Sequence, residues 1–498
     1  MVKTRATTRA KAKRAWRAAA AVIDLDGAVI AIVQCLDRAD DVVALLEALP
    51  HASLGTPLTA LLDLLQEPGP LAHTWPELLL DNVSFRYPSF VEHILQAMPV
   101  LLSVRTAHRN LFGCLLQPTD SNVDAPDGFL EFVATYPRTV THVDAAWQED
   151  DIDCSVFCDA LRRCTRLTTV HVVANAHAAA VLAAVTTPAH RVTALYITKP
   201  SSGVMEALDW TSLLRPWLAS GHARHVTFFS IPIVDVDNLA HALLRTPSVR
   251  SLGVHYNDAL LRSLLARNVL LPPFEKVSVA TDEPPLLPRL LKRLSPKTLT
   301  SLSLEGHVDH SETLAYLPSM PCLNHLSLTR GDLGDLDGIS ALDGILAWSR
   351  LQRLAISCVY LTPTTLEAVL SYLDGVDSLQ QLILDVAEMD AMYFVSVAQT
   401  LGRLMERGLQ SAAAARHRLS SPLMLDVGEH SFSIDGIRMI LDALAKCKCV
   451  CVKMVPVDGT ELEPYHDEIY AFASAHHMIC DLTYPPFMLC SPTNVIYE

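Results

Sequence analysis

A short apolar pattern recurs along the carboxyl-terminal two thirds of the chain. Its clearest copies are Leu299–Leu304 (LTSLSL) and Leu323–Leu328 (LNHLSL). Each copy has an apolar residue, two variable residues, an apolar residue, one variable residue and a final apolar residue. The last three positions alternate, which predicts a short β-strand that places its apolar side chains on one face.

Twelve copies of the pattern fit one frame, mostly 24 to 32 residues apart, without a charged or amide side chain at the second or third apolar position. We expect the second apolar positions to lie side by side in adjacent strands. These positions are Val170, Leu195, Val226, Leu252, Val277, Leu302, Leu326, Leu354, Leu382, Leu423, Val450 and Leu482.

The intervals between the predicted strands carry apolar residues at helical spacing, which predicts a short helix in each. Prolines at 188, 247, 272 and 296 follow several of these helices, where the chain must leave the helix before the next strand. Strand and helix alternating at a fixed period predict a solenoid, in which each repeat packs on its neighbours. The clearest helical stripes are Leu239, Leu243, Leu244; Leu260, Leu261, Leu264, Leu265; Leu366, Val369, Leu370, Leu373; and Ile437, Ile440, Leu441, Leu444.

Repeats of this length with true helices resemble the ribonuclease-inhibitor class of leucine-rich-repeat proteins. The resemblance implies an α/β solenoid that is curved, with parallel strands on the concave side and helices on the convex side. The asparagine that many such repeats place after the third apolar position survives only as Asn175 and Asn257. One longer interval, from Leu379 to Ser420, predicts a helical insertion at about residues 390–418. It is either a lateral projection used for binding or a tolerated insertion on the convex side.

The amino-terminal end divides into two segments. Residues 1–20 carry seven basic residues and no acid, which predicts a disordered basic tail, with a nuclear-import patch around Lys11–Arg14 or an organelle transit peptide as open alternatives. Residues 21–78 have compact helical periodicity and form a separate module. Residues 79–498 then form the solenoid, with clear repeats from about residue 167 and candidate early strands at Leu80–Phe85, Leu111–Leu116 and Val140–Val143.

The module at residues 21–78 resembles an F-box, and this resemblance implies docking on a Skp1-type linker of cullin-RING ubiquitin ligases. Asp26 stands where that family usually has proline, and Gly55–Pro70 lengthens the gap before the closing tryptophan. The alternative is a helical cap that shields the apolar face of the first repeat. The residues that match the F-box pattern are Leu25, Val29, Ile32, Leu36, Asp40, Val42, Trp75 and Leu78.

Composition limits the classes of partner and the cellular compartments that we expect for this protein. The formal charge of −15 disfavours nonspecific binding to nucleic acid. The twelve cysteines lack the spacing of a disulfide scaffold, and the start of the chain lacks a secretory pattern, so we expect reduced, buried thiols in an intracellular protein, cytoplasmic or nuclear. The uncharged run Thr168–His190 is long enough for a membrane span, but its polar residues and repeat frame predict strand, turn and helix instead. We therefore expect no nucleic-acid or membrane partner.

The sequence offers little enzymatic chemistry. It has no phosphate-binding glycine loop, paired zinc-ligand set or nucleophile elbow. Cys447, Cys449 and Cys451 alternate on a predicted strand, and His476 and His477 are the nearest further ligands for a zinc ion, which needs four. Ordinary strand cysteines are the favoured interpretation, with Cys449 and Cys451 pointing outward. We expect no catalytic residue, no metal and no cofactor.

The variable strand positions are more informative, because they line the predicted concave face where a partner would lie. They mix aromatics, histidines and both signs of charge without a basic stripe, which suits a protein or peptide partner. These candidate binding residues are His171, Tyr196, His225, Phe229, His255, Lys276, Glu305, His325, Arg353, Asp385 and Lys453.

The sequence therefore predicts a non-enzymatic protein-interaction receptor. If the F-box resemblance holds, the protein recruits a target for ubiquitination. A regulatory repeat protein without ligase links, such as an inhibitor or a GTPase activator resembling the Ran-activating class, is the first alternative. An α/β enzyme whose strand and helix alternation is misread is the second.

Overall fold

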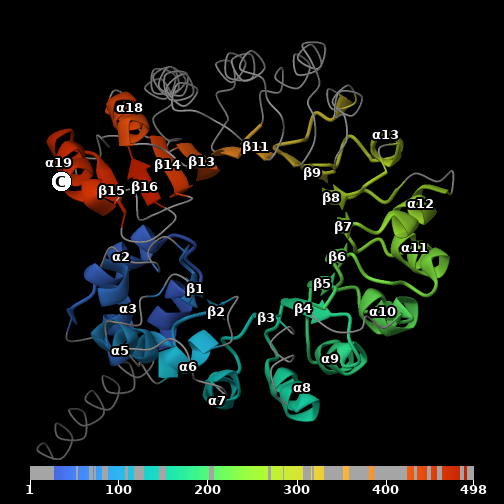
Figure 1. Ribbon diagram of the computed structural model, residues 1–498. Helices are drawn as coiled ribbons and strands as arrows, with labels where there is room; N and C mark the ends of the chain where they lie inside the picture. Colours follow the sequence, from blue (N-terminus) through green and yellow to red (C-terminus); the bar gives the residue numbers. More distant parts are fainter. Residues whose placement is uncertain are drawn as a thin grey trace, which may run out of the picture. The chain divides into compact units, whose positions relative to one another are not determined.

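The chain folds as two compact units, and both alternate strands with helices (Figure 1). Unit 1 comprises residues 1–223 and 231–234, and unit 2 comprises residues 224–230 and 235–498. The computed structural model describes residues 27–51, 54–66, 71, 74–80, 83, 88–106, 110–116, 128–144, 153–200, 207–266, 271–283, 285–306, 316, 319–329, 351–357, 381–385, 423–430, 434–445, 450–456, 463–482 and 487–490.

Unit 1 alternates short strands with helices, after an initial helical segment at residues 27–33. Its elements are α2 (Ala39–Glu47), α3 (Thr56–Gln66), β1 (Glu77–Leu79), α5 (Pro88–Ala97), β2 (Ser103–Arg105), α6 (Asn110–Leu116), α7 (Gly128–Thr135), β3 (His142–Asp144), α8 (Cys154–Arg163), β4 (Thr169–Val173), α9 (Ala178–Val185), β5 (Ala194–Thr198) and α10 (Trp210–Ala219).

The strands of unit 1 pair in parallel, one repeat apart. β1 pairs with β2, and β3, β4 and β5 pair in chain order, with Val143 opposite Val170 and Val170 opposite Leu195. The uncharged run Thr168–His190 forms β4 and α9, as predicted. No helix within the described residues is long and apolar enough to cross a membrane.

The first helices of unit 1 pack on its first repeats. The Gln34 side-chain amide donates to the Val100 carbonyl (3.1 Å), and the Trp75 indole donates to the Leu36 carbonyl (2.8 Å). Val29 and Val42 are buried, whereas Ile32 is 50% exposed. These contacts are those expected of a cap on the first repeat.

Two of the early strand predictions are wrong. The first strand is β1, so Leu78 of the F-box-like pattern is a strand residue, and Leu80 and Val83 of the predicted Leu80–Phe85 strand lie outside it. The predicted strand at Leu111–Leu116 is helix α6. A short apolar run does not distinguish a buried strand from a buried helix turn, which is why these two were misassigned. The candidate at Val140–Val143 was closer, because it overlaps β3.

Unit 2 continues the alternation. Its elements are β6 (His225–Phe229), α11 (Val236–Leu244), β7 (Ser251–His255), α12 (Asp258–Ala266), β8 (Lys276–Ala280), α13 (Leu286–Leu291), β9 (Ser301–Glu305), β10 (His325–Thr329), β11 (Arg353–Ser357), β12 (Gln381–Asp385), β13 (Leu423–His430), α18 (Ile434–Leu444), β14 (Val450–Pro456), the 3-10 turn η6 (Glu463–Tyr465), α19 (His466–Ala475), β15 (Ile479–Asp481) and β16 (Phe487–Cys490).

Strands β6 to β14 pair in chain order, and every pair is parallel. Leu302 lies opposite Leu326, Leu326 opposite Leu354, and Leu354 opposite Leu382, one repeat apart in each case. This register confirms the predicted column of second apolar positions from Val226 to Leu382. Beyond β12 the prediction is wrong, because Leu425 rather than Leu423 lies opposite Leu382, which leaves Leu423 and Val450 two residues out of the column. Leu482 lies just after β15. The arrangement agrees with the predicted α/β leucine-rich-repeat solenoid.

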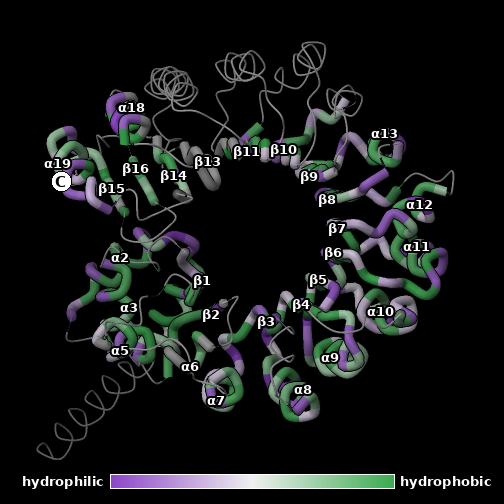
Figure 2. The backbone as a smooth tube through the Cα atoms, viewed as in Figure 1, coloured by the Kyte–Doolittle hydropathy of each residue, from purple (hydrophilic) through white to green (hydrophobic). Residues whose placement is uncertain are grey.

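The core of unit 2 lies between the strands and the helices (Figure 1). Burial alternates along β9 and β10, where Leu302, Leu304, Leu326 and Leu328 are almost fully buried and their neighbours are half-buried. The predicted helical stripes on α11, α12 and α18 are buried as well, except for Leu244 of α11, which is half-buried. Figure 2 shows hydrophobic and hydrophilic positions alternating along these elements. Each buried leucine contributes about 1.5–3 kcal/mol relative to an exposed one.

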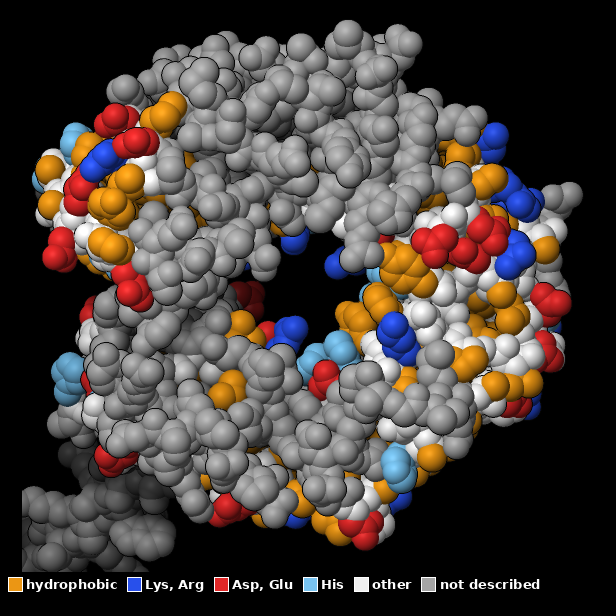
Figure 3. All heavy atoms as spheres, in the orientation of Figure 1, with side chains coloured by type: hydrophobic (Ala, Val, Ile, Leu, Met, Phe, Trp, Pro, Cys, Tyr) orange, Lys and Arg blue, Asp and Glu red, His pale blue; other side chains and the backbone are white. Residues whose placement is uncertain are grey.

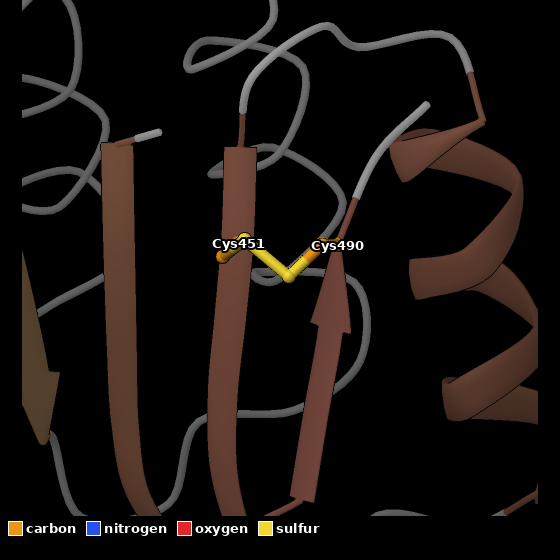
Figure 4. Close-up of a disulfide and its surroundings, with 2 residues drawn as sticks. All are labelled: Cys451 and Cys490. Atoms are coloured by element: carbon orange, nitrogen blue, oxygen red, sulfur yellow. A yellow bond between two sulfur atoms is a disulfide. The ribbon is translucent and has the colours of Figure 1, made fainter. Parts of the chain in front are cut away.

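The carboxyl-terminal end of unit 2 departs from the repeat. β16 pairs antiparallel with both β14 and β15, so the strand predicted from Ile479 lies one place further out than the repeat frame requires. A disulfide joins Cys451 of β14 to Cys490 of β16 (Figure 4). The prediction that all cysteines are reduced thiols is therefore wrong for this pair, because apposed strands bring two residues 39 positions apart together. Cys451 is also buried rather than outward-pointing on a free face.

Several predictions lie outside the described residues. They are the basic tail at 1–20, Leu25 of the F-box-like pattern, the helical stripe at Leu366–Leu373, the insertion at about 390–418, and Cys447 and Cys449.

Candidate interaction face

In unit 2, the strand residues that alternate with the buried column point to the side of the sheet opposite the helices. We call this side of β6–β11 the open face; it corresponds to the predicted concave face. Figure 3 shows basic and histidine side chains beside hydrophobic ones along these strands.

The strand register sorts the open face into three rows. The first strand positions form the amino-terminal row, the third positions form the central row, and the fifth positions form the carboxyl-terminal row. The amino-terminal row is His225, Ser251, Lys276, Ser301, His325 and Arg353. The central row is Thr227, Gly253, Ser278, Ser303, Ser327 and Ala355. The carboxyl-terminal row is Phe229, His255, Ala280, Glu305, Thr329 and Ser357.

The carboxyl-terminal row carries an aromatic cluster. The Phe229 ring stacks on the His255 ring (centroids 5.6 Å apart) and meets the Tyr256 ring edge-on (5.8 Å). Tyr256 follows β7 with φ +52°, and its hydroxyl donates to Glu305 Oε1 (2.6 Å). Stacked rings and a short hydrogen bond hold these side chains in place in the unbound protein.

His255 is the most constrained residue of this cluster. Its Nε2 lies 3.0 Å from Ser278 Oγ, and its buried Nδ1 has no hydrogen-bond partner among the described residues. Burial lowers the pKa of His255, and Glu305 opposes that change by raising it. The ring is therefore held mainly in its neutral form at neutral pH.

A hydrogen-bonded network links the first two rows across β6 and β7. His225 Nδ1 lies 2.5 Å from Ser251 Oγ, and its Nε2 lies 2.9 Å from Thr227 Oγ1. Thr227 in turn covers Gly253 in the neighbouring strand, where a side chain would collide with it. The centre of the open face is therefore polar and carries only small side chains at these positions.

The amino-terminal row concentrates positive charge. Lys276, His325 and Arg353 occupy it on β8, β10 and β11, with Lys276 and Arg353 exposed and His325 half-buried. His325 Nδ1 donates a hydrogen bond to the Asn324 side-chain oxygen (2.5 Å). Burial lowers the pKa of His325, and Arg353 and Lys276 lower it further. The positive charges of Lys276 and Arg353 therefore favour the neutral form of His325 between them.

Unit 1 has a separate polar cluster on β1–β5. His171 stacks on Tyr196 (4.5 Å), meets His142 edge-on (4.9 Å), and has Nδ1 3.9 Å from Asp144 Oδ2. Burial lowers the pKa of His171, while Asp144 raises it and Arg105 lowers it. Burial likewise raises the pKa of Tyr196. An ion pair between Arg105 and Glu77 (3.6 Å) borders the cluster.

The structure thus places nine of the predicted binding residues in these clusters and rows. Asp385 lies in β12 opposite Ser357, which continues the carboxyl-terminal row, but its side chain is outside the described residues. Lys453 lies in β14 opposite Asp426 and Met488. Sequence reasoning missed Tyr256, because it follows its strand. It also missed Thr227, Ser251 and Ser278, whose small polar side chains give no signal of their own.

Metal-binding and thiol chemistry find no support within the described residues. No group of three or more potential ligands there could hold a metal ion. Cys451 is bonded to Cys490, while His476 and His477 are exposed. The sulfurs of Cys154 and Cys158 are 3.9 Å apart on α8, and burial raises the pKa of Cys158 to about 11, which keeps that thiol protonated.

A cavity of about 490 Å³ lies on the helix side of unit 1, between the ends of α9 and α10. His190 lines it, but both ring nitrogens are already engaged, with Thr187 Oγ1 (2.7 Å) and the Leu161 carbonyl (3.1 Å). The Trp217 indole donates to the Val192 carbonyl (2.7 Å). These satisfied groups hold adjacent repeats together.

Comparison with known proteins adds little to this description. No family model matches the chain, and no curated protein matches it. A solved protein from Bacteroides fragilis is similar over 51% of this chain and 63% of its own, with 11% identity and a TM-score of 0.29. The structure of TLR13 in a complex with ssRNA13 is similar over 58% of this chain and 43% of its own, with 12% identity and a TM-score of 0.25. The chain therefore spans less than two thirds of either structure. Because both scores are low, the assignment of the fold rests on strand register and burial.

Proposed function

We propose that this protein is a non-enzymatic interaction receptor that binds a protein or peptide through the open face of β6–β11. The observation that carries the proposal is the arrangement of that face. Aromatic, histidine and charged side chains lie in register on the side of the sheet that the described helices leave uncovered.

The composition of the face favours a protein partner. Phe229 and Tyr256 supply rigid aromatic surface, and Glu305, Lys276 and Arg353 supply both signs of charge. Interfaces between proteins are enriched in aromatic residues and arginine and take most of their energy from a few such side chains. The small residues of the central row allow a partner backbone to approach the sheet between the two outer rows.

Peptide selection tests the proposal. Random peptides displayed on phage are selected against the full-length protein, and each binder is measured again on two variants. Ser303→Trp places a large side chain in the central row, whereas Lys297→Trp places the same side chain at an exposed position after α13. We expect binders whose affinity falls at least tenfold on Ser303→Trp and is unchanged on Lys297→Trp. Binders that ignore Ser303→Trp, or a selection without binders, would contradict the proposal.

A role as a substrate-recruiting subunit of a ubiquitin ligase is the second candidate. It draws on the F-box resemblance and is supported by one feature, the 50% exposure of the large apolar side chain of Ile32. Pull-down with purified Skp1 tests it: the wild type should retain Skp1, and Ile32→Asp should lose it. Equal absence of Skp1 from both samples removes the ligase role and leaves a regulatory repeat protein.

A further inference from the structure

The two cations of the amino-terminal row, Lys276 and Arg353, lack a counter-charge within the described residues. Lys276 and Arg353 form no ion pair there, and His325 bonds only the neutral Asn324 side chain. In contrast, two other arginines of unit 2 have acidic partners: Arg262 pairs with Glu283 (3.5 Å) and Arg438 with Glu468 (2.7 Å). The chain as a whole has 54 acidic residues against 39 basic ones, so this row is positively charged in a protein whose net charge is negative.

The register places these cations close together. His325 and Arg353 are direct neighbours on adjacent strands, and Lys276 lies two strands from His325 with only Ser301 between them. At about 4.8 Å between strands, the row from β8 to β11 spans roughly 14 Å. That length corresponds to about four residues of extended chain. Like charges at this spacing repel one another and attract an anionic partner.

The opposite edge of the open face has a different character. Phe229, His255 and Tyr256 form the aromatic cluster, and the Glu305 carboxylate is engaged by the Tyr256 hydroxyl. The two edges are four residues apart along each strand, or roughly 13 Å at about 3.3 Å per residue. An extended chain laid across the strands would send alternate side chains toward each edge.

We infer that the open face takes an acidic, extended segment of a protein partner. Its carboxylates face Lys276, His325 and Arg353, and its apolar side chains face the cluster of Phe229, His255 and Tyr256. The segment crosses the strands over the small central row. This inference rests on the proposed function and names the chemistry of its partner.

The test uses those phage-selected peptides that Ser303→Trp blocks. Their sequences should be enriched in Asp and Glu, and the synthetic peptides should lose affinity when each Glu is replaced by Gln. The double variant Lys276→Glu, Arg353→Glu should bind them at least tenfold more weakly. Its matched control is Lys297→Glu, Arg289→Glu, two exposed cations of unit 2 that lie outside the open face, and it should bind like the wild type. On the wild type, affinity should fall as salt rises.

The outcomes separate the two proposals. Peptides that are blocked by Ser303→Trp but bind the charge-reversed protein equally well or better overturn the acidic segment and leave the receptor function standing. Peptides indifferent to Ser303→Trp overturn the receptor function itself. Unchanged thermal unfolding of both double variants confirms that a loss of binding is not a loss of folding.

Discussion

Gly253 lies directly opposite Thr227 in the neighbouring strand, and the Thr227 side chain occupies the space that a side chain at Gly253 would need. A Cβ atom at position 253 would meet Oγ1, Cγ2 and Cβ of Thr227 well inside normal contact distance. The same Thr227 hydroxyl bonds His225, so it cannot turn away without breaking that contact.

We therefore expect Gly253→Ala to lower the free energy of unfolding by about 1–3 kcal/mol through overpacking. Urea unfolding measures the change. Thr227→Ala removes two of the three clashing atoms, so the double variant should recover part of the loss. Strictly additive effects of the two substitutions would contradict the contact.

The buried column and the open face should respond differently to truncation. Leu302→Ala removes a side chain that is 1% exposed and should lower the free energy of unfolding by about 2–5 kcal/mol. Ser303→Ala changes the adjacent half-buried residue and should cost less than about 0.5 kcal/mol. Urea unfolding of the two variants compares them directly. Equal losses would mean that the alternation of β9 is misassigned.

The Cys451–Cys490 disulfide should stabilise the last strands of unit 2. It closes a segment of 39 residues, for which chain entropy predicts roughly 4 kcal/mol. We expect Cys490→Ala to increase amide hydrogen exchange in β14, β15 and β16 while leaving β7–β9 unchanged. Cys322→Ala, which alters a cysteine with a free thiol, is the matched control. Identical exchange in the two variants would show that the bond contributes nothing to these strands.

Stability should fall as the medium becomes acidic. Burial lowers the pKa of His255 in the folded protein, so the folded state binds a proton less readily than the unfolded chain, in which histidine titrates near about 6.5. The contribution of the neutral ring is complete above that pH and is lost progressively below it. His171 and His325 shift in the same direction.

The corresponding experiment compares the wild type with His255→Phe, which keeps an aromatic ring beside Phe229. Urea unfolding at pH 7.5, 6.5 and 5.5 should show a smaller loss of stability for the variant. A loss as steep as in the wild type would exclude His255 as a contributor.

The Trp75 indole ties the amino-terminal helices to the first repeat. Trp75→Phe keeps the buried ring but removes the donor to the Leu36 carbonyl, which should cost about 0.5–1.5 kcal/mol. Limited proteolysis is expected to cut the segment before α3 sooner in this variant. An unchanged cleavage rate would show that the hydrogen bond is not needed to hold the cap.

The strand repeat was predictable because it depends only on the spacing of apolar residues along the chain. Every strand from β4 to β12 has apolar residues at its second and fourth positions, and one frame places Leu302, Leu326 and Leu354 side by side. The early strands were harder, since β1, β2 and β3 have only three residues each and offer too few positions for a period to appear.

The open face was predictable as a set of residues and not as an arrangement. The sequence gives no basic stripe, because Lys276, His325 and Arg353 are separated by 49 and 28 residues. Sorting residues by their place within each strand would have found the row. The Tyr256–Glu305 bond and the Cys451–Cys490 bridge could not be found that way, since each depends on side-chain geometry or on a strand outside the repeat.

The antiparallel strand β16 has a consequence for how copies of the chain can associate. Had β14 ended the sheet, its seven residues would offer unsatisfied amides to any extended chain, including a second copy. β16 pairs with four of those residues. The outermost strand of the described sheet is then β15, which is only three residues long. Because this edge strand is so short, pairing of one copy with the next through the sheet edge, and growth into fibres, are unfavourable.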